Sequence, residues 1–522
     1  MKTALLIIAL TIPVILHGST TPCESLAAIA LPNITITIAE ARPAGEFTPP
    51  GAKPIANLPA FCRVAGAIKP SSDSDIRFEV WLPSSGWNGK FQGIGNGGYA
   101  GVISFGGLAD AVRNGYATAS TDTGHQDSGT SAAWALNHPE KIVDFGHRAI
   151  HETAVGAKAV IRAFYGEGPK RSYFNSCSNG GRQALMEAQR YPEDYDGIIA
   201  GAPANYWTHL LSAAASGVRA TLSEPASYIP AAKLPAIQAA VLTQCDSTDQ
   251  VKDGVIENPL TCRFDATVLQ CKGDESDSCL TVAQLAALKA IYGGLRTNGG
   301  RPIFPGLSPG GEAEQGGWAP WITGDAPQKS LMYAFSTQFF TNMVYSKPDW
   351  QFRTFDSDRD VKAADERMAR HLNATDPDLR AFQKRGGKLI LYHGWADAAI
   401  PAVNAINYFD SVVSKMGNNT VREFSRLYMV PGMEHCGGGA GPNVFGQAGT
   451  PNADRFHNID AALEAWVEQG TAPDQIIATK YKNNADPKSG IARTRPLCPW
   501  PQIAKYKGSG STDDAANFVC GK

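Results

Sequence analysis

The sequence predicts an α/β fold, a mostly parallel sheet with helices on both faces that is interrupted by a large inserted segment. Short apolar runs of strand length alternate with stretches in which apolar residues recur at helical spacing. The alternation breaks between about residues 205 and 385 and then resumes. A chain of about 500 residues also exceeds what one hydrophobic core usually organises, so an inserted second domain is expected.

The expected strands cover residues 76–82, 90–94, 116–121, 171–175, 196–200, 387–392 and 424–430. The expected helices cover residues 149–164, 182–190 and 459–468. The interrupting stretch is rich in Gly, Pro and aromatic residues, which is typical of a lid over the strand ends. We therefore expect residues 1–20 to be a leader, residues 21–204 and 386–522 to form the α/β domain, and residues 205–385 to form the lid.

The first 20 residues predict export. Met1-Lys2-Thr3, an apolar run and small residues around 18–20 have the pattern of a signal peptide, and are too short and wrongly flanked for a membrane anchor. All ten cysteines follow this segment, an even number that suits an oxidising compartment. We expect a secreted or periplasmic protein with five disulfides.

The charge balance excludes two classes of partner. Lys and Arg number 47 against 49 acidic residues, and no basic run or aromatic-interleaved basic patch occurs. Neither nucleic acid nor an anionic membrane is therefore expected to bind.

Ser178 is the candidate nucleophile. It follows the strand expected at 171–175 and precedes a helix, with the small residues Ser176 and Gly180 two positions away on each side. A serine on a tight strand-to-helix turn needs such neighbours, because strand and helix backbones meet there. The alternative is an ordinary serine at a helix N-cap.

Asp397 and His435 supply the other members of a possible triad. Each follows an expected core strand, and the chain order Ser, Asp, His is that of α/β hydrolases. Taken singly, Asp397 could be a turn residue and His435 a structural histidine. His393 is a rival base, but it precedes the acid by only four residues, so we expect it to line the substrate pocket.

A cysteine stands beside each of two candidate residues, in Cys177-Ser178 and His435-Cys436. A disulfide between these cysteines would hold their Cα atoms about 5.5–6 Å apart, which would force Ser178 and His435 within hydrogen-bonding range. An oxyanion hole would take one N–H from Asn179 and one from the glycine-rich loop at 95–98, although a glycine cluster alone also suits a plain turn.

These motifs resemble the tannase and feruloyl esterase family. The resemblance rests on Cys-Ser-x-Gly-Gly with Arg182, on residues 191–203, on Tyr-His-Gly-x-x-Asp ending at 397, and on Val-Pro-Gly-Met-x-His-Cys ending at 436. It extends over essentially the mature chain and implies an α/β-hydrolase fold with a lid. It implies Ser178, Asp397 and His435 as the triad, and Gly98 with Asn179 as oxyanion donors. It also implies the bridges Cys23–Cys62, Cys177–Cys436, Cys245–Cys262, Cys271–Cys279 and Cys498–Cys520.

A second site is expected in the lid. Asp246, Asp249 and Asp253 place three carboxylates within eight residues, and such hard oxygen ligands suit Ca²⁺. The resemblance adds the backbone carbonyls of Val251 and Val255 as ligands. A solvated acidic turn is the alternative, and a bound calcium would be structural.

The substrate is expected to be a small aromatic ester. Trp318, Trp321 and Phe335 in the lid offer surface for a planar acyl group, though such clusters are as often core. Feruloyl esters, galloyl esters (as for a tannase) and mono(2-hydroxyethyl) terephthalate compete. The last is disfavoured because residues 328–336 contain no arginine for its carboxylate, and Lys329 lacks the bidentate fork. Between the first two we favour feruloyl. A non-catalytic binding protein of the same fold is the alternative of another class.

Overall fold

The computed structural model describes residues 21–447 and 454–522, so the expected leader lies outside the described residues. A nine-stranded sheet runs through the molecule in the order β1-β4-β5-β7-β6-β8-β9-β12-β13. Its strands are β1 (Ile34–Arg42), β4 (Phe61–Ile68), β5 (Ile76–Pro83), β7 (Ala117–Thr121), β6 (Lys90–Ile94), β8 (Arg171–Cys177), β9 (Gly197–Gly201), β12 (Lys388–Gly394) and β13 (Ser425–Val430).

The sheet has an antiparallel and a parallel part. Strands β1, β4, β5 and β7 pair antiparallel, whereas every pair from β7 through β6, β8, β9 and β12 to β13 is parallel. The parallel part therefore places the carboxyl ends of β6, β8, β12 and β13 at one edge, where the candidate residues follow them.

Helices cover both faces, as expected for the α/β class. Successive side chains of β12 point to opposite faces of the sheet. Leu389 and Leu391 pack with one set of helices, and Ile390 packs with the other. The first set comprises α3 (Ala149–Tyr165), α4 (Asn179–Arg190), α11 (Val403–Met416) and α12 (Asn418–Phe424). The second comprises α1 (Phe105–Arg113) and α13 (Ile459–Gln469). Of the short helices, α10 (Arg380–Lys384) contributes Phe382 to the core beneath the first set, whereas α2 (Pro139–Val143) contributes Ile142 to a third core that it shares with residues of the long insertion.

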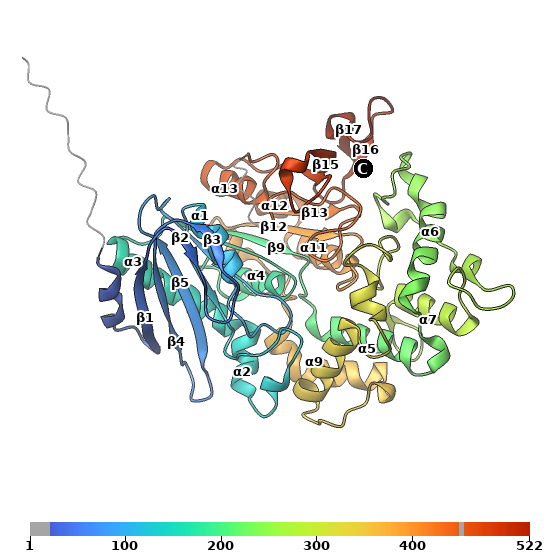
Figure 1. The fold of residues 1–522 in the computed structure, drawn as a ribbon, viewed down its shortest axis with the longest axis horizontal. Coiled ribbons are helices and arrows are strands. Elements are labelled where there is room, and N and C mark those ends of the chain that lie inside the picture. Colours follow the sequence, from blue (N-terminus) through green and yellow to red (C-terminus); the bar gives the residue numbers. More distant parts are fainter. Residues whose placement is uncertain (1–20, 448–453) are drawn as a thin grey trace, which may run out of the picture.

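The long insertion lies between two neighbouring strands. Strands β9 and β12 pair in parallel, and the chain between them adds no strand to the large sheet, although it is described throughout. Figure 1 shows its helices beside the end of the sheet where β9 and β12 lie. They are α5 (Trp207–Leu222), α6 (Leu234–Cys245), α7 (Val282–Gly293), α8 (Leu331–Gln338), α9 (Ser357–Leu372) and the short α10, with the short hairpin β10 (Leu295–Arg296) and β11 (Pro302–Phe304). We call this insertion the lid.

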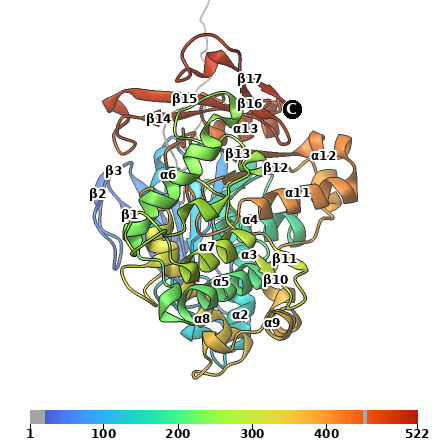
Figure 2. The same ribbon diagram turned by 90° about the vertical axis from the view of Figure 1, so that its right-hand side faces the viewer.

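Three further hairpins lie outside the large sheet. They are β2 (Gly45–Phe47) with β3 (Ile55–Leu58), β14 (Ile476–Tyr481) with β15 (Ile491–Leu497), and β16 (Ile503–Tyr506) with β17 (Phe518–Gly521). Figure 2 shows the two C-terminal hairpins close to α6 of the lid. Among the described residues, no helix has both the length and the apolar character needed to cross a membrane.

Candidate active site

Ser178 stands on a sharp turn between β8 and α4. Its backbone angles are φ 67° and ψ −125°, a strained combination for a residue other than glycine. The turn brings strand and helix so close that a Cβ atom on Gly180 would lie 1.9 Å from Ser176 Oγ. Only glycine fits at position 180, which explains the small residues seen around Ser178 in the sequence.

His435 lies between Ser178 and Asp397. Its Nε2 is 2.9 Å from Ser178 Oγ, and its Nδ1 is 2.9 Å from Asp397 Oδ2. An ionised Asp397 accepts a hydrogen bond from Nδ1–H, which leaves Nε2 as the acceptor for the Ser178 hydroxyl. The three residues, which lie far apart in the sequence, thus form one hydrogen-bonded chain.

Asp397 is fully buried and remains ionised. Burial alone would raise its pKa, but its contacts with His435 and His393 hold the pKa well below the ordinary range. Its Oδ1 also accepts hydrogen bonds from the N–H groups of Ala399, at 2.8 Å, and Ile400, at 2.9 Å.

The structure corrects our expectation that His393 lines the substrate pocket. The side chain is completely buried, 3.2 Å from Asp397 Oδ2 and 3.0 Å from the carbonyl of Ile400. His393 is the last residue but one of β12, and its side chain points into the core behind Asp397. Its role there is to contact the acid rather than the substrate.

The expected bridge joins the two loops. Cys177 and Cys436 are disulfide-bonded with Cα atoms 5.9 Å apart, so the residues next to them, Ser178 and His435, are covalently linked through their neighbours. The other bridges in the structure are Cys23–Cys62, Cys245–Cys262, Cys271–Cys279 and Cys498–Cys520.

Gly98 and Asn179 flank Ser178 at the wall of the same pocket. Asn179 is the first residue of α4, so its N–H has no acceptor within the helix. Gly98 has φ 56°, and a Cβ atom there would lie 2.2 Å from the carbonyl oxygen of Gly129. Position 98 therefore has no room for a side chain.

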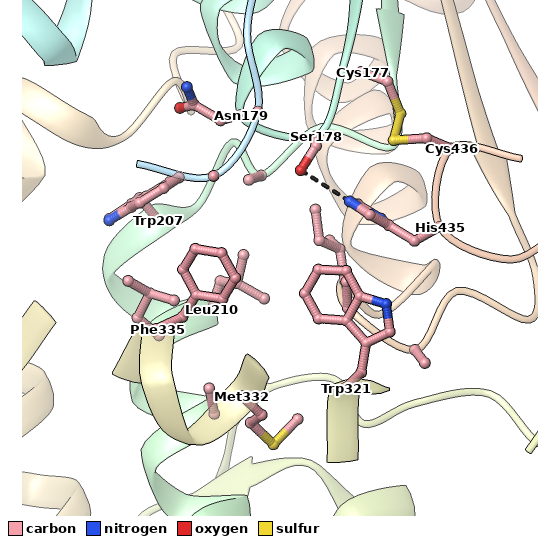
Figure 3. Close-up of a pocket in the computed structure, with 18 residues that line it drawn as sticks. Cys177, Ser178, Asn179, Trp207, Leu210, Trp321, Met332, Phe335, His435 and Cys436 are labelled. Atoms are coloured by element: carbon pink, nitrogen blue, oxygen red, sulfur yellow. Dashed lines mark hydrogen bonds between the residues drawn. A yellow bond between two sulfur atoms is a disulfide. The ribbon is translucent and has the colours of Figure 1, made fainter. Parts of the chain in front are cut away.

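The pocket beside Ser178 is apolar and has a volume of about 370 Å³. Figure 3 shows Ser178 and His435 on one side of it, with Trp321 and Met332 of the lid facing them. The Trp321 ring packs edge-on against the His435 ring at 5.0 Å between centroids. The other lining side chains are Trp207, Leu210, Leu211, Ala214, Phe335 and Ile400, with small residues between them.

Trp321 and Phe335 thus lie where we expected them, but Trp318 does not. Trp318 is 2% exposed and packs inside the lid core against Tyr292. Trp207, Leu210 and Met332 were not predicted, because an apolar residue on a lid helix cannot be told from a core residue until the direction of its side chain is known.

The comparisons with known proteins agree with this geometry. The profile of the family described as "Tannase and feruloyl esterase" matches residues 62–521. The chain belongs to this family. An uncharacterized esterase of Xanthomonas campestris pv. campestris is 45% identical over 523 residues, which cover 95% of this chain and 91% of the relative. A probable feruloyl esterase B-2 of Aspergillus flavus is 36% identical over 447 residues, covering 84% and 83%.

Solved structures of the family share the fold. Feruloyl esterase B from Aspergillus oryzae has a TM-score of 0.88 at 30% identity and covers 96% of this chain and 99% of its own. Tannin acyl hydrolase from Aspergillus niger has a TM-score of 0.75 at 24% identity, covers 96% and 95%, and supports the fold alone. The family member described here is a carboxylic ester hydrolase with the α/β-hydrolase fold and a lid.

The expected calcium loop follows α6 in the lid. The carboxylates of Asp246, Asp249 and Asp253 each accept hydrogen bonds from backbone N–H groups of the loop. Asp253 Oδ2 also contacts Arg493 at 2.9 Å and Arg495 at 2.8 Å. The donor chemistry suits Ca²⁺, but in the described residues no three His, Cys, Asp or Glu side chains are grouped to hold a metal ion. Two arginines occupy the oxygen that Asp253 would offer.

Proposed function

We propose that this family member is a secreted serine carboxylesterase that hydrolyses aromatic, feruloyl-type hydroxycinnamoyl esters through an acyl-enzyme. The observation that carries the proposal is the hydrogen-bonded chain from Ser178 through His435 to Asp397, beside an apolar pocket. A nucleophile, a base and a group that orients the base are the parts that acyl transfer needs.

Acylation begins at the Ser178 hydroxyl. His435 Nε2 accepts the hydroxyl proton as Oγ attacks the ester carbonyl, and Asp397 stabilises the imidazolium that forms. The carbonyl oxygen becomes negative and accepts hydrogen bonds from the N–H groups of Gly98 and Asn179. His435 then donates its proton to the leaving alcohol oxygen, and the C–O bond breaks.

Deacylation repeats these steps with water. His435 takes a proton from a water molecule that attacks the acyl-enzyme, and then returns the proton to Ser178 Oγ as the acid leaves. Trp321 packs against His435 on the lid side, so it shields this proton transfer from bulk solvent.

The pocket supports a neutral aromatic acyl group. No Lys, Arg, Asp or Glu side chain occurs among the described residues that line it, and Lys329 is exposed outside it. A terephthalate monoester would bury a carboxylate without a partner, and a galloyl group would bury three ring hydroxyls among apolar walls. Each unpaired hydroxyl costs about 1–3 kcal/mol, so a hydroxycinnamoyl group, with fewer hydroxyls, is favoured.

A substrate panel tests the choice. The values of kcat/KM for methyl ferulate, methyl gallate and mono(2-hydroxyethyl) terephthalate should decrease in that order. A higher value for the gallate would make the protein a tannase, and a higher value for the terephthalate would assign it to that third activity.

A non-catalytic binding protein is the alternative of another class. Release of p-nitrophenol from a short acyl ester by the wild-type protein, abolished in Ser178→Ala, would exclude it. Binding of an aromatic ester without turnover would support it.

Export and calcium complete the proposal. The expected leader and the five disulfides support a secreted or periplasmic location, which cell fractionation with N-terminal sequencing of the mature protein would test.

We also propose a structural Ca²⁺ held by the carboxylates of Asp246, Asp249 and Asp253 and the carbonyls of Val251 and Val255. It would supply charge neutralisation to the loop and no step of the chemistry.

A further inference from the structure

A positive charge is buried behind the pocket without a counter-ion. Arg182 is on α4, four residues after Ser178, and its side chain is 0% exposed. It forms no ion pair with any Asp or Glu that the structure describes, and Arg190 is the charged neighbour that acts on it. A buried unpaired charge lowers the stability of the folded protein. A function of the charge would explain why the protein has it.

The guanidinium is held by neutral groups. It donates hydrogen bonds to the carbonyl oxygens of Gly146 at 2.7 Å and Phe145 at 3.0 Å, and Nε donates to Asn179 Oδ1 at 2.9 Å. The rings of Phe145 and Trp207 lie 4.7 and 5.1 Å from it. These contacts fix its position without neutralising it.

Arg182 stays charged at neutral pH. Burial lowers the pKa of its guanidinium to about 9, with a smaller contribution from Arg190. Glu187, the acid of the same helix, does not offset the charge, because burial raises its pKa well above the ordinary range.

This charge lies directly behind the candidate oxyanion hole. Two of its partners, Asn179 and Trp207, form part of the pocket wall beside Ser178. The Asn179 side chain also donates to the carbonyl of Asn96 at 3.1 Å, and Asn96 and Gln183 exchange two hydrogen bonds of 3.1 and 2.8 Å. Asn96 is two residues before Gly98, so the network joins both segments that carry the candidate oxyanion donors.

We propose that Arg182 is a positioning residue of the oxyanion hole, which holds Asn179 in place and sets an uncompensated positive charge behind it for the negative tetrahedral intermediate. The proposal rests on the proposed nucleophilic role of Ser178. A fixed charge in a buried site lowers the stability of the resting enzyme. It stabilises the negative charge that exists only near the transition state. Arg182 therefore acts on kcat rather than on substrate binding.

Phenylboronic acid provides a readout that a purely structural role would not change. Ser178 Oγ forms a B–O bond, its proton passes to His435, and the boron becomes tetrahedral with a negative charge in the oxyanion hole. In Arg182→Met, which removes the charge, we expect kcat for a short p-nitrophenyl ester to fall about 10- to 100-fold, with KM within about twofold. The inhibition constant of the boronate should rise by a similar factor. In Arg182→Lys, both kcat and the inhibition constant should lie between those of the wild type and Arg182→Met.

Arg190→Met is the matched control, because Arg190 is an exposed arginine of the same helix. It should leave both kcat and boronate affinity unchanged. If Arg182→Met does not fold, Asn179→Ala removes the acceptor of the Arg182 Nε bond together with the donor to the Asn96 carbonyl, and it should weaken boronate binding more than it changes KM.

Two results would overturn the proposal, and one of them leaves the proposed function intact. A lower melting temperature in the Arg182 variants with unchanged kcat and boronate affinity would make Arg182 a structural residue only. A wild-type enzyme that is insensitive to the boronate, with activity retained in Ser178→Ala, would instead refute the role of Ser178 on which the proposal rests.

Discussion

Asp397 contacts four groups, and this arrangement defines how it acts on His435. Oδ1 accepts hydrogen bonds from two backbone N–H groups, and Oδ2 lies between the rings of His435 and His393. The carboxylate cannot rotate without losing several of these contacts. It therefore fixes the orientation of the His435 ring and the nitrogen that carries the proton.

Asp397→Asn should test this role. The amide would retain most of the shape but would favour the wrong tautomer of His435, so we expect kcat to fall by about 10⁴ with a small change in KM. Steady-state kinetics on a soluble aromatic ester would measure it. Near-normal turnover would contradict the role of Asp397.

Glu434, next to His435, is a residue that the sequence did not single out. It is 1% exposed, and neither carboxylate oxygen has a hydrogen-bond partner among the described residues. Burial, followed by the charges of Asp397, Glu312 and Glu314, raises the pKa of Glu434 to about 10. The side chain is therefore protonated in the folded protein at neutral pH.

Glu434→Gln should stabilise the protein, increasingly at higher pH. Because the folded-state pKa lies above the unfolded value, the unfolded chain releases this proton at lower pH than the folded one. The free energy of unfolding then declines as pH rises from about 4.5 to about 10. Glutamine removes that decline, so the gain in Tm should be small at pH 4.5 and several degrees near pH 9. The exposed Glu366→Gln is the control, and a gain independent of pH would refute the argument.

At the scale of elements, the parallel strands and the antiparallel strand β5, expected at 76–82, were predictable, whereas two antiparallel strands were not. The strands expected at 171–175, 387–392 and 424–430 form β8, β12 and β13, because short apolar runs buried on both faces leave a clear signal. The antiparallel strands β1 and β4 were missed. Strand β1 alternates exposed and less exposed residues, and its place depends on pairing with β4, which no local pattern specifies.

A second, smaller cavity of about 40 Å³ adjoins the apolar pocket. Leu210, Ala214, Met332 and Ala399 line both cavities. Met332 is the longest and most flexible of these side chains, and a Cβ atom on Gly217 would lie 3.2 Å from its sulfur. The Met332 side chain therefore limits the depth of the pocket.

Met332→Ala should join the two cavities. We expect kcat/KM for a longer aromatic acyl ester to rise several-fold relative to that for a benzoyl ester, because one buried methylene is worth about 0.8 kcal/mol. The ratio of the two values is the measurement. Met343→Ala, a buried lid methionine outside both cavities, should lower stability without changing the ratio.

The Cys177–Cys436 bridge links the last residue of β8 to the loop after β13. The sheet and four other bridges hold the α/β domain and lid, whereas proton transfer needs Ser178 and His435 placed to within about 0.5 Å. The double variant Cys177→Ala/Cys436→Ala should therefore fold and lose far more of kcat than of Tm. For comparison, Cys498→Ala/Cys520→Ala should lower Tm and preserve kcat. Normal turnover at a much lower Tm in the first variant would make its bridge a stabiliser of the fold.

At the scale of the whole molecule, the site was more predictable than the pocket. Ser178, Asp397 and His435 each follow a strand of the sheet, so their order and spacing were enough to bring them together. The pocket wall comes from the lid, where the direction of each aromatic side chain depends on packing between distant helices. Trp318 and Trp321 are three residues apart, yet one is in the core of the lid and the other faces His435.

The proposed calcium loop connects three distant parts of the chain. A Cβ atom on Gly432, in the loop of His435, would lie 3.1 Å from Val255, and Arg493 and Arg495 of β15 bind Asp253. The loop thus joins the lid to the loop of the candidate base and to the C-terminal hairpins. Asp253 contacts the two arginines in the structure, and the proposed metal ion would compete with them for the same carboxylate.

Chelation should therefore act on stability rather than on chemistry. If Ca²⁺ binds, excess EGTA removes a ligand of the native state and should lower Tm by several degrees, while kcat at temperatures well below the transition stays unchanged. Asp249→Asn, a loop carboxylate that does not contact the arginines, should abolish this dependence, whereas the exposed Asp277→Asn in the same lid should retain it. An unchanged Tm in EGTA, together with elemental analysis that finds no calcium, would mean that Arg493 and Arg495 alone neutralise Asp253. The loop would then be held to the C-terminal hairpins by ion pairs instead of by a metal.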